Sequence, residues 1–144
     1  MRPAIRRPAF EQLWPRIEDW ILAEDPDELV VAHNAAFDMG VIRDACTASA
    51  VPWPEARYAC TLVVSRLTWR LLTYRLPFVA DAAGVAMGDH HDAQVDADTA
   101  AHVMISAMRL HQTDTLDDLL AGLRVRYGQQ TGDSWTGAQR LRSS

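Results

Sequence analysis

The sequence predicts an α/β fold, because apolar runs suited to strands alternate with segments of helical periodicity. Leu29–Ala32 is a short, wholly apolar run between turn signals, which is typical of a buried strand in a parallel sheet. Arg57–Thr61 is the second expected strand, with a helix between the two. Since two strands make a poor sheet, we expect helices packed on a short residual sheet.

Apolar spacing predicts the helices in turn, beginning with the amphipathic segment Phe10–Ala23, which stops at Asp25-Pro26. The second helix is capped by Asn34 and ends before Val51. Four more helices are expected: Leu62–Leu72, Leu76–Ala83, which Gly84 closes, Ala93–Leu110 and Leu116–Leu123. From Tyr127 the chain is rich in Gly, Gln, Thr and Ser, which predicts a loose tail. We therefore expect a domain over residues 1–126 and a loose tail over 127–144.

Length and charge narrow the class of protein. A chain of 144 residues is one domain, and its net charge of −5 argues against a protein that coats duplex nucleic acid, because such binding needs basic surface. The sequence holds no run that predicts a membrane span, and its basic start is not followed by the apolar stretch of a secretory signal. We expect a cytoplasmic protein without membrane association, in which Cys46 and Cys60 are buried thiols.

Two aspartates stand one helical turn before apolar residues of their own helices. Asp38 precedes Val41 and Ile42, and Asp96 precedes Thr99 and Ala100, so each carboxylate is expected to face the apolar stripe. A charge there is costly unless something binds it. Each of these helices also follows a histidine, at His33 and His91. The combination points to metal-assisted phosphodiester hydrolysis.

Both motifs resemble those of a known enzyme family. The apolar strand running into His33-Asn34, followed by Phe37-Asp38, and the run His91-Asp92-Ala93 followed by Asp96-Ala97, are similar to two motifs of DnaQ-like 3′→5′ exonucleases of the DEDDh type. The resemblance covers roughly residues 10 to 110 and implies a ribonuclease H-like exonuclease fold.

The resemblance also implies a mechanism and partners. Asp38 and Asp96 would help to hold two divalent metal ions, Mg²⁺ or Mn²⁺, and His91 would accept the proton of the attacking water. An imidazole suits that role near neutral pH. The implied substrates are 3′ ends of single-stranded DNA or RNA, and a DNA polymerase or another replication or repair protein is the implied kind of partner.

One family motif has no counterpart. The Asp-x-Glu pair of the opening strand supplies two further carboxylates in the family, whereas here Glu18-Asp19 lies in an expected helix and Asp25–Glu28 in a turn. We therefore expect an N-terminally truncated domain that lacks the opening antiparallel strands, binds metal weakly and has little or no activity.

The sequence leaves two interpretations open for several side chains. Asn34 either only caps its helix or also helps to place the substrate end, and Phe37 is either a core residue or a ring that stacks on a base. His90 is expected to be structural and Asp92 to cap the long helix. Three arginines are either phosphate contacts or part of a solvated face: Arg66, Arg70 and Arg75.

Two other functions compete with the exonuclease. The first is a noncatalytic remnant that binds a nucleic-acid end or a partner protein. The second is an HD-type phosphohydrolase, suggested by His91-Asp92 and the upstream His33. That fold is all-helical, so the strand expected before His33 weighs against it.

Overall fold

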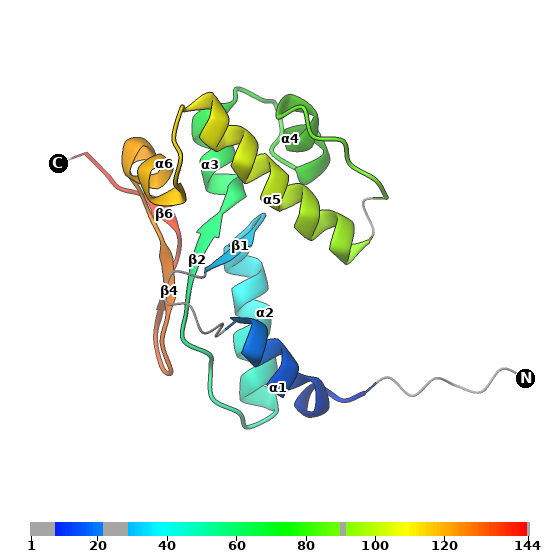
Figure 1. Cartoon of the computed structure of the whole chain (residues 1–144). Helices are drawn as coiled ribbons and strands as arrows, with labels where there is room; N and C mark the ends of the chain where they lie inside the picture. The colour runs from blue at the N-terminus through cyan, green and yellow to red at the C-terminus, as the bar shows by residue number, and fades with distance from the viewer. Residues whose placement is uncertain (1–7, 22–28, 90–91, 144) are drawn as a thin grey trace, which may run out of the picture.

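The computed structural model describes residues 8–21, 29–89 and 92–143, and Figure 1 shows their arrangement. The helices are α1 (Phe10–Ile21), α2 (Ala35–Ala48), α3 (Thr61–Thr68), α4 (Leu76–Ala82), α5 (Ala93–Leu110) and α6 (Leu116–Leu123). The strands are β1 (Val30–Ala32), β2 (Ala56–Cys60), β3 (Val125–Arg126), β4 (Gly128–Gln130), β5 (Trp135–Thr136) and β6 (Gln139–Arg140). The α/β prediction is confirmed.

The main sheet has the strand order β1-β2-β4-β5. β1 and β2 are parallel, with Val31 opposite Ala59, as the apolar run and the intervening helix α2 predict. β4 pairs with β2 in the antiparallel sense, and β5 pairs with β4 in the same way. A second, two-stranded sheet joins β3 to β6.

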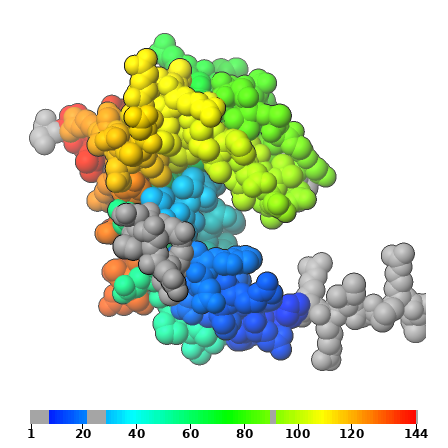
Figure 2. Space-filling view, viewed as in Figure 1, coloured from blue at the N-terminus to red at the C-terminus, as the bar shows by residue number. Residues whose placement is uncertain are grey.

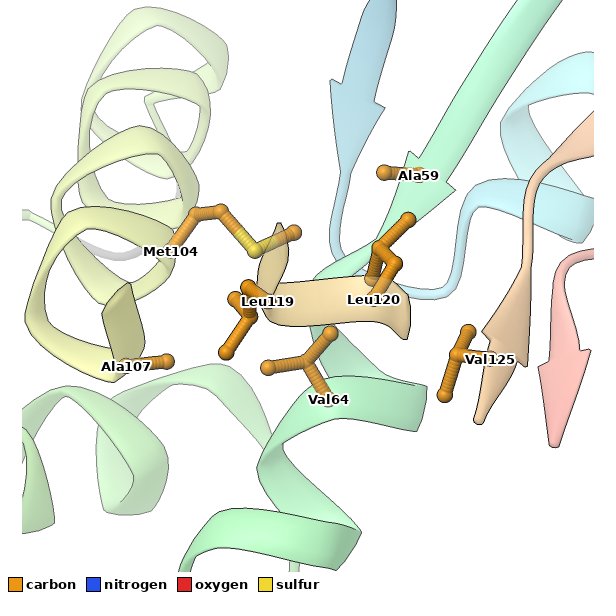
Figure 3. Packing of buried hydrophobic residues seen from close by; sticks show 7 residues of the cluster. All are labelled: Ala59, Val64, Met104, Ala107, Leu119, Leu120 and Val125. Atoms are coloured by element: carbon orange, nitrogen blue, oxygen red, sulfur yellow. The ribbon is translucent and has the colours of Figure 1, made fainter. Parts of the chain in front are cut away.

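Alternation along the parallel strands divides the core between the two faces of the sheet. Ala59 belongs to a cluster with residues of α3, α5, α6 and β3, shown in Figure 3: Val64, Met104, Ala107, Leu119, Leu120 and Val125. Its neighbours Tyr58 and Cys60 point to the opposite face and pack on Ala35 and Met39 of α2. α2 therefore covers one face and the later helices cover the other (Figure 1).

The C-terminal segment differs from the predicted loose tail, because residues 128–130 form β4 in the main sheet. Gly128 is buried against the ring of Tyr58, and the Tyr58 hydroxyl donates a hydrogen bond to the Thr136 carbonyl at 2.9 Å. Gln130 is 2% exposed. The prediction was wrong here because polar composition indicates exposure only when no tertiary partner meets the polar groups.

α3 ends at Thr68, four residues before the predicted Leu72. The Tyr74 hydroxyl donates to the Trp69 carbonyl at 2.9 Å and accepts from the Leu71 amide at 3.4 Å, so these backbone groups need no helical partner. Trp69 and Leu71 then pack on the cluster between α4 and α5. Tertiary packing has here replaced the last helical turn.

Within the described ranges, no helix is long and apolar enough to cross a membrane.

Candidate metal and nucleotide site

A cavity of about 480 Å³ lies where β1 ends. Its lining comes from β1, α2, the start of α4 and α5: Val31, Ala32, His33, Asp38, Arg75, Leu76, Ala93, Asp96, Ala97 and Ala100. In Figure 2 a hollow is visible between the yellow-green surface of α5 and the cyan surface of β1 and α2. We call this cavity the aspartate pocket.

Asp38 and Asp96 enter the aspartate pocket from different helices. Each lies in the first turn of its helix, α2 and α5 respectively, where the exposed backbone amides favour negative charge. Burial raises the pKa of the Asp38 carboxyl, while a backbone hydrogen bond and the nearby His33 lower it. The structure thus brings together two carboxylates that are far apart in the sequence.

The expected core-facing direction of Asp38 needs correction. Its side chain is exposed, and Val41, expected to point inward, is 52% exposed. α2 instead buries the stripe that contains Ala35, Met39 and Arg43. Arg43 has the residue type of a surface position but lies in the buried stripe, together with Cys46, which was expected to be buried and is 0% exposed. Asp38 consequently lines an open pocket.

The two expected substrate-contacting residues lie outside the lining of the aspartate pocket. Asn34 is exposed and has the left-handed backbone conformation, with φ at 63°, and its side chain makes no capping hydrogen bond, contrary to the prediction. Phe37 is 67% exposed on α2, directly before Asp38, so it is not the core residue of the alternative interpretation.

His91, the expected general base, and His90 lie outside the described residues. The next residue, Asp92, caps α5 as predicted. Its Oδ1 accepts hydrogen bonds from the backbone amides of Gln94 at 2.9 Å and Val95 at 3.4 Å.

His33 has a role that the sequence did not reveal, because both ring nitrogens are held by the protein. Nε2 lies 2.8 Å from the Tyr74 carbonyl and Nδ1 lies 2.9 Å from the Thr61 hydroxyl. A carbonyl only accepts, so Nε2 carries the proton and donates. In the neutral ring Nδ1 accepts the Thr61 proton at 2.9 Å, which is shorter than the 3.4 Å from that hydroxyl to the Ala32 carbonyl. Burial lowers the pKa of His33, which favours this neutral form. The ring therefore ties the end of β1 to the starts of α3 and α4.

These contacts count against the HD-type phosphohydrolase. That hypothesis rested on His91-Asp92 and the upstream His33. His33 makes hydrogen bonds to protein groups through both ring nitrogens and Asp92 caps α5, while His91 lies outside the described residues. The parallel pair β1–β2 also does not belong to an all-helical fold. That alternative was wrong.

The donor set of the aspartate pocket suits a hard divalent cation, since carboxylate oxygens are the ligands that Mg²⁺ and Mn²⁺ prefer. Asp38 and Asp96 are the acidic residues of its lining, and Arg75 adds an exposed positive charge. Over the described ranges, no group of three or more His, Cys, Asp or Glu side chains is arranged to hold a metal ion. Asp38 and Asp96 can therefore supply some of the ligands of a divalent metal ion, but not a complete set.

Comparison with known proteins identifies the family. The RNase_T family model, described as exonuclease, matches residues 5–104. The chain is 28% identical over 134 residues to the 3′-5′ exonuclease DinG of Staphylococcus aureus strain bovine RF122 / ET3-1. The alignment covers 83% of this chain and 15% of that protein. With DinG of strain USA300 the chain shares 30% identity over 113 residues, covering 78% of this chain and 12% of that one.

No solved structure was found to match the chain. The chain belongs to the RNase_T exonuclease family, and its α/β architecture is that of a ribonuclease H-like exonuclease domain. The predicted DnaQ-like family is confirmed. The chain spans 12% to 15% of the length of the curated relatives named above.

Proposed function

We propose that this exonuclease-family chain contributes a divalent-metal-dependent 3′→5′ exonuclease site of the DEDDh type, which hydrolyses phosphodiester bonds at 3′ ends of single-stranded DNA or RNA. The observation that carries the proposal is the meeting of Asp38 and Asp96 in one pocket at the end of β1. The family match and the similarity to 3′-5′ exonucleases support it.

The charged residues of the pocket and His33 each have a role in this proposal. Asp38 and Asp96 would hold Mg²⁺ or Mn²⁺, which supplies Lewis-acid stabilisation of the charge that develops on the phosphate. Arg75 contacts the phosphate of the terminal nucleotide. His33 fixes the backbone at the end of β1. By the family resemblance, His91 accepts the proton of the attacking water, and Asn34 and Phe37 contact the terminal nucleotide from outside the pocket lining.

Weak activity is expected of the chain itself. Two carboxylates carry two negative charges, which balance one divalent ion, whereas two-metal catalysis places two such ions roughly 3.5–4 Å apart. We therefore expect weak binding of Mg²⁺ or Mn²⁺ and slow hydrolysis. The Asp-x-Glu motif on an opening strand stays a prediction, which translation of the reading frame upstream of Met1 tests.

Titration of Mn²⁺, followed by electron paramagnetic resonance, tests the metal site. Asp38→Asn and Asp96→Asn should each reduce the bound ion relative to the unmodified chain. Asp44→Asn on α2 and Asp98→Asn on α5 are matched controls, because both are exposed and neither lines the pocket. Equal binding by all four variants and the unmodified chain would contradict the proposed ligands.

Hydrolysis is tested with a single-stranded oligonucleotide labelled at its 5′ end. Metal-dependent shortening from the 3′ end supports the proposal. In a version that includes the expected opening strands, His91→Ala should slow hydrolysis by about 10²–10⁴ while the metal stays bound, whereas His90→Ala should do much less. Equal loss in both variants would refute His91 as the base. Strand binding without metal-dependent shortening would favour the noncatalytic remnant instead.

We also propose that the partner is a DNA polymerase or another replication or repair protein, and that the location is cytoplasmic. Affinity purification of the tagged full-length protein from its own cells tests the partner.

A further inference from the structure

A second cavity, of about 430 Å³, lies beside the segment that follows α3. It is lined by Arg66, Trp69, Arg70, Leu71, Leu72 and Tyr74, and we call it the arginine pocket. Arg66 and Arg70 are exposed, and neither guanidinium has a hydrogen bond or an ion pair in the part of the chain that the structure describes. Both charges are therefore available to a ligand.

A hydrogen bond and the adjacency of two residues in the chain connect the arginine pocket to the aspartate pocket. The Tyr74 carbonyl, in the lining of the first, accepts the hydrogen bond from His33, in the lining of the second. Tyr74 is followed directly by Arg75, which lines the aspartate pocket. The positive charge of Arg66 is also close enough to His33 to lower its pKa. The two pockets are thus neighbours that share the His33–Tyr74 contact.

The chemistry of the arginine pocket is that of a nucleic-acid contact. The whole chain is acidic, with a net charge of −5, so two exposed arginines at one cavity form a local positive surface that suits phosphate. Leu72 is fully exposed and Trp69 is partly buried at the same cavity, and apolar or aromatic surface of this kind contacts unstacked bases. A duplex keeps its bases stacked, so this surface favours a single strand.

We propose that the arginine pocket is a binding subsite for a single strand of nucleic acid whose 3′ end occupies the aspartate pocket. The strand runs past Arg75, and Arg66 and Arg70 contact phosphates further from the 3′ end. This inference rests on the proposed exonuclease function for the direction of the strand, while the contact with the arginine pocket can be measured without hydrolysis.

The test is binding of a fluorescein-labelled single strand of eight nucleotides, measured by fluorescence anisotropy with EDTA at several salt concentrations. The double variant Arg66→Gln/Arg70→Gln is compared with Arg140→Gln/Arg142→Gln, which removes the same charge from exposed positions of the C-terminal segment. Because all four arginines are exposed, both variants should fold, and circular dichroism checks that they do.

Loss of two phosphate contacts should weaken binding several-fold and reduce the slope of log affinity against log salt by about 1.4, at about 0.7 per contact on a single strand. The control variant should keep the slope of the unmodified chain. Equal slopes in the two variants, no binding by the unmodified chain, or equal competition by a blunt duplex would each overturn the subsite.

Failure of the subsite and failure of the proposed function give different results. If the chain shortens 3′ ends but the slope of log affinity against log salt does not depend on Arg66 and Arg70, the exonuclease function is supported and the subsite is refuted. A chain that shows the expected slope change without any hydrolysis keeps the subsite and loses the exonuclease function.

Discussion

Gly128 allows β4 to lie against the ring of Tyr58, so its replacement by alanine should destabilise the fold. A Cβ at this position would lie 2.2 Å from Cε2 and Cζ of Tyr58 and 2.7 Å from Cδ2. Carbon atoms in favourable contact are about 3.5–4.0 Å apart. Tyr58 is 0% exposed and its hydroxyl is bonded to the Thr136 carbonyl, so neither the ring nor the strand can move without losing contacts.

The expected loss follows from two contributions. Overpacking of a buried site costs about 1–3 kcal/mol, and loss of the Tyr58 hydrogen bond costs about 1 kcal/mol more. The free energy of unfolding should therefore fall by about 2–4 kcal/mol. At about 3 °C per kcal/mol for a domain of this size, the melting temperature should fall by about 6–12 °C. Thermal denaturation followed by circular dichroism measures the change.

Gly122→Ala is the matched control, because it makes the same substitution where the added Cβ meets nothing within 4 Å. Gly122 lies inside α6, where alanine is favoured over glycine by about 0.8–1.0 kcal/mol, so this variant should melt at a higher temperature than the unmodified chain. If Gly128→Ala melts at the same temperature as the unmodified chain, then β4 is not packed on Tyr58 and the C-terminal segment is the loose tail that its composition suggests.

Three further predictions concern buried or capping side chains. The Arg43 side chain is 7% exposed, its guanidinium carbon lies 4.1 Å from the ring centroid of Trp135, and it donates a hydrogen bond to the Gln130 side chain. Arg43→Ala should therefore lower the free energy of unfolding by about 2–3 kcal/mol. An unchanged midpoint of urea denaturation would contradict this packing. Asp92→Ala removes the cap of α5 and should cost about 1 kcal/mol in the same assay, and no loss would mean that the cap does not contribute. Burial lowers the pKa of His33, so its contribution to the free energy of unfolding is fully present above the ordinary pKa of 6.5 and is lost as the pH falls below that value. His33→Gln should therefore flatten the pH dependence of the free energy of unfolding in that range. An unaltered profile would refute the burial of a neutral ring.

Local patterns in the sequence were enough for most of the helices and for the parallel strands. Leu29–Ala32 is apolar throughout, and its last three residues form β1 beside β2. Asp92 caps α5, and Gly84 has a φ of 69° after α4, as their residue types predict. These features depend on a few neighbouring residues, so periodicity and capping chemistry reveal them.

The family motifs around Asp38 and Asp96 could likewise be found in the sequence, but not the surroundings of the two carboxylates. The structure brings both to one pocket and adds Arg75 and His33 to its lining. The structural role of His33 could not be predicted, because its hydrogen-bond partners, Thr61 and Tyr74, are remote in the chain. Long-range hydrogen bonds of this kind leave no local pattern.

Most of the helices, the parallel strand pair and the two motif aspartates can be predicted from the sequence, because each depends on residues close together in the chain. The burial of Arg43, the strand Gly128–Gln130 and the end of α3 at Thr68 depend instead on contacts between distant segments. Gln130 accepts a hydrogen bond from Arg43 and donates one to the Pro54 carbonyl. A polar segment becomes part of the sheet when remote groups meet its hydrogen-bonding atoms, and composition carries no record of those partners.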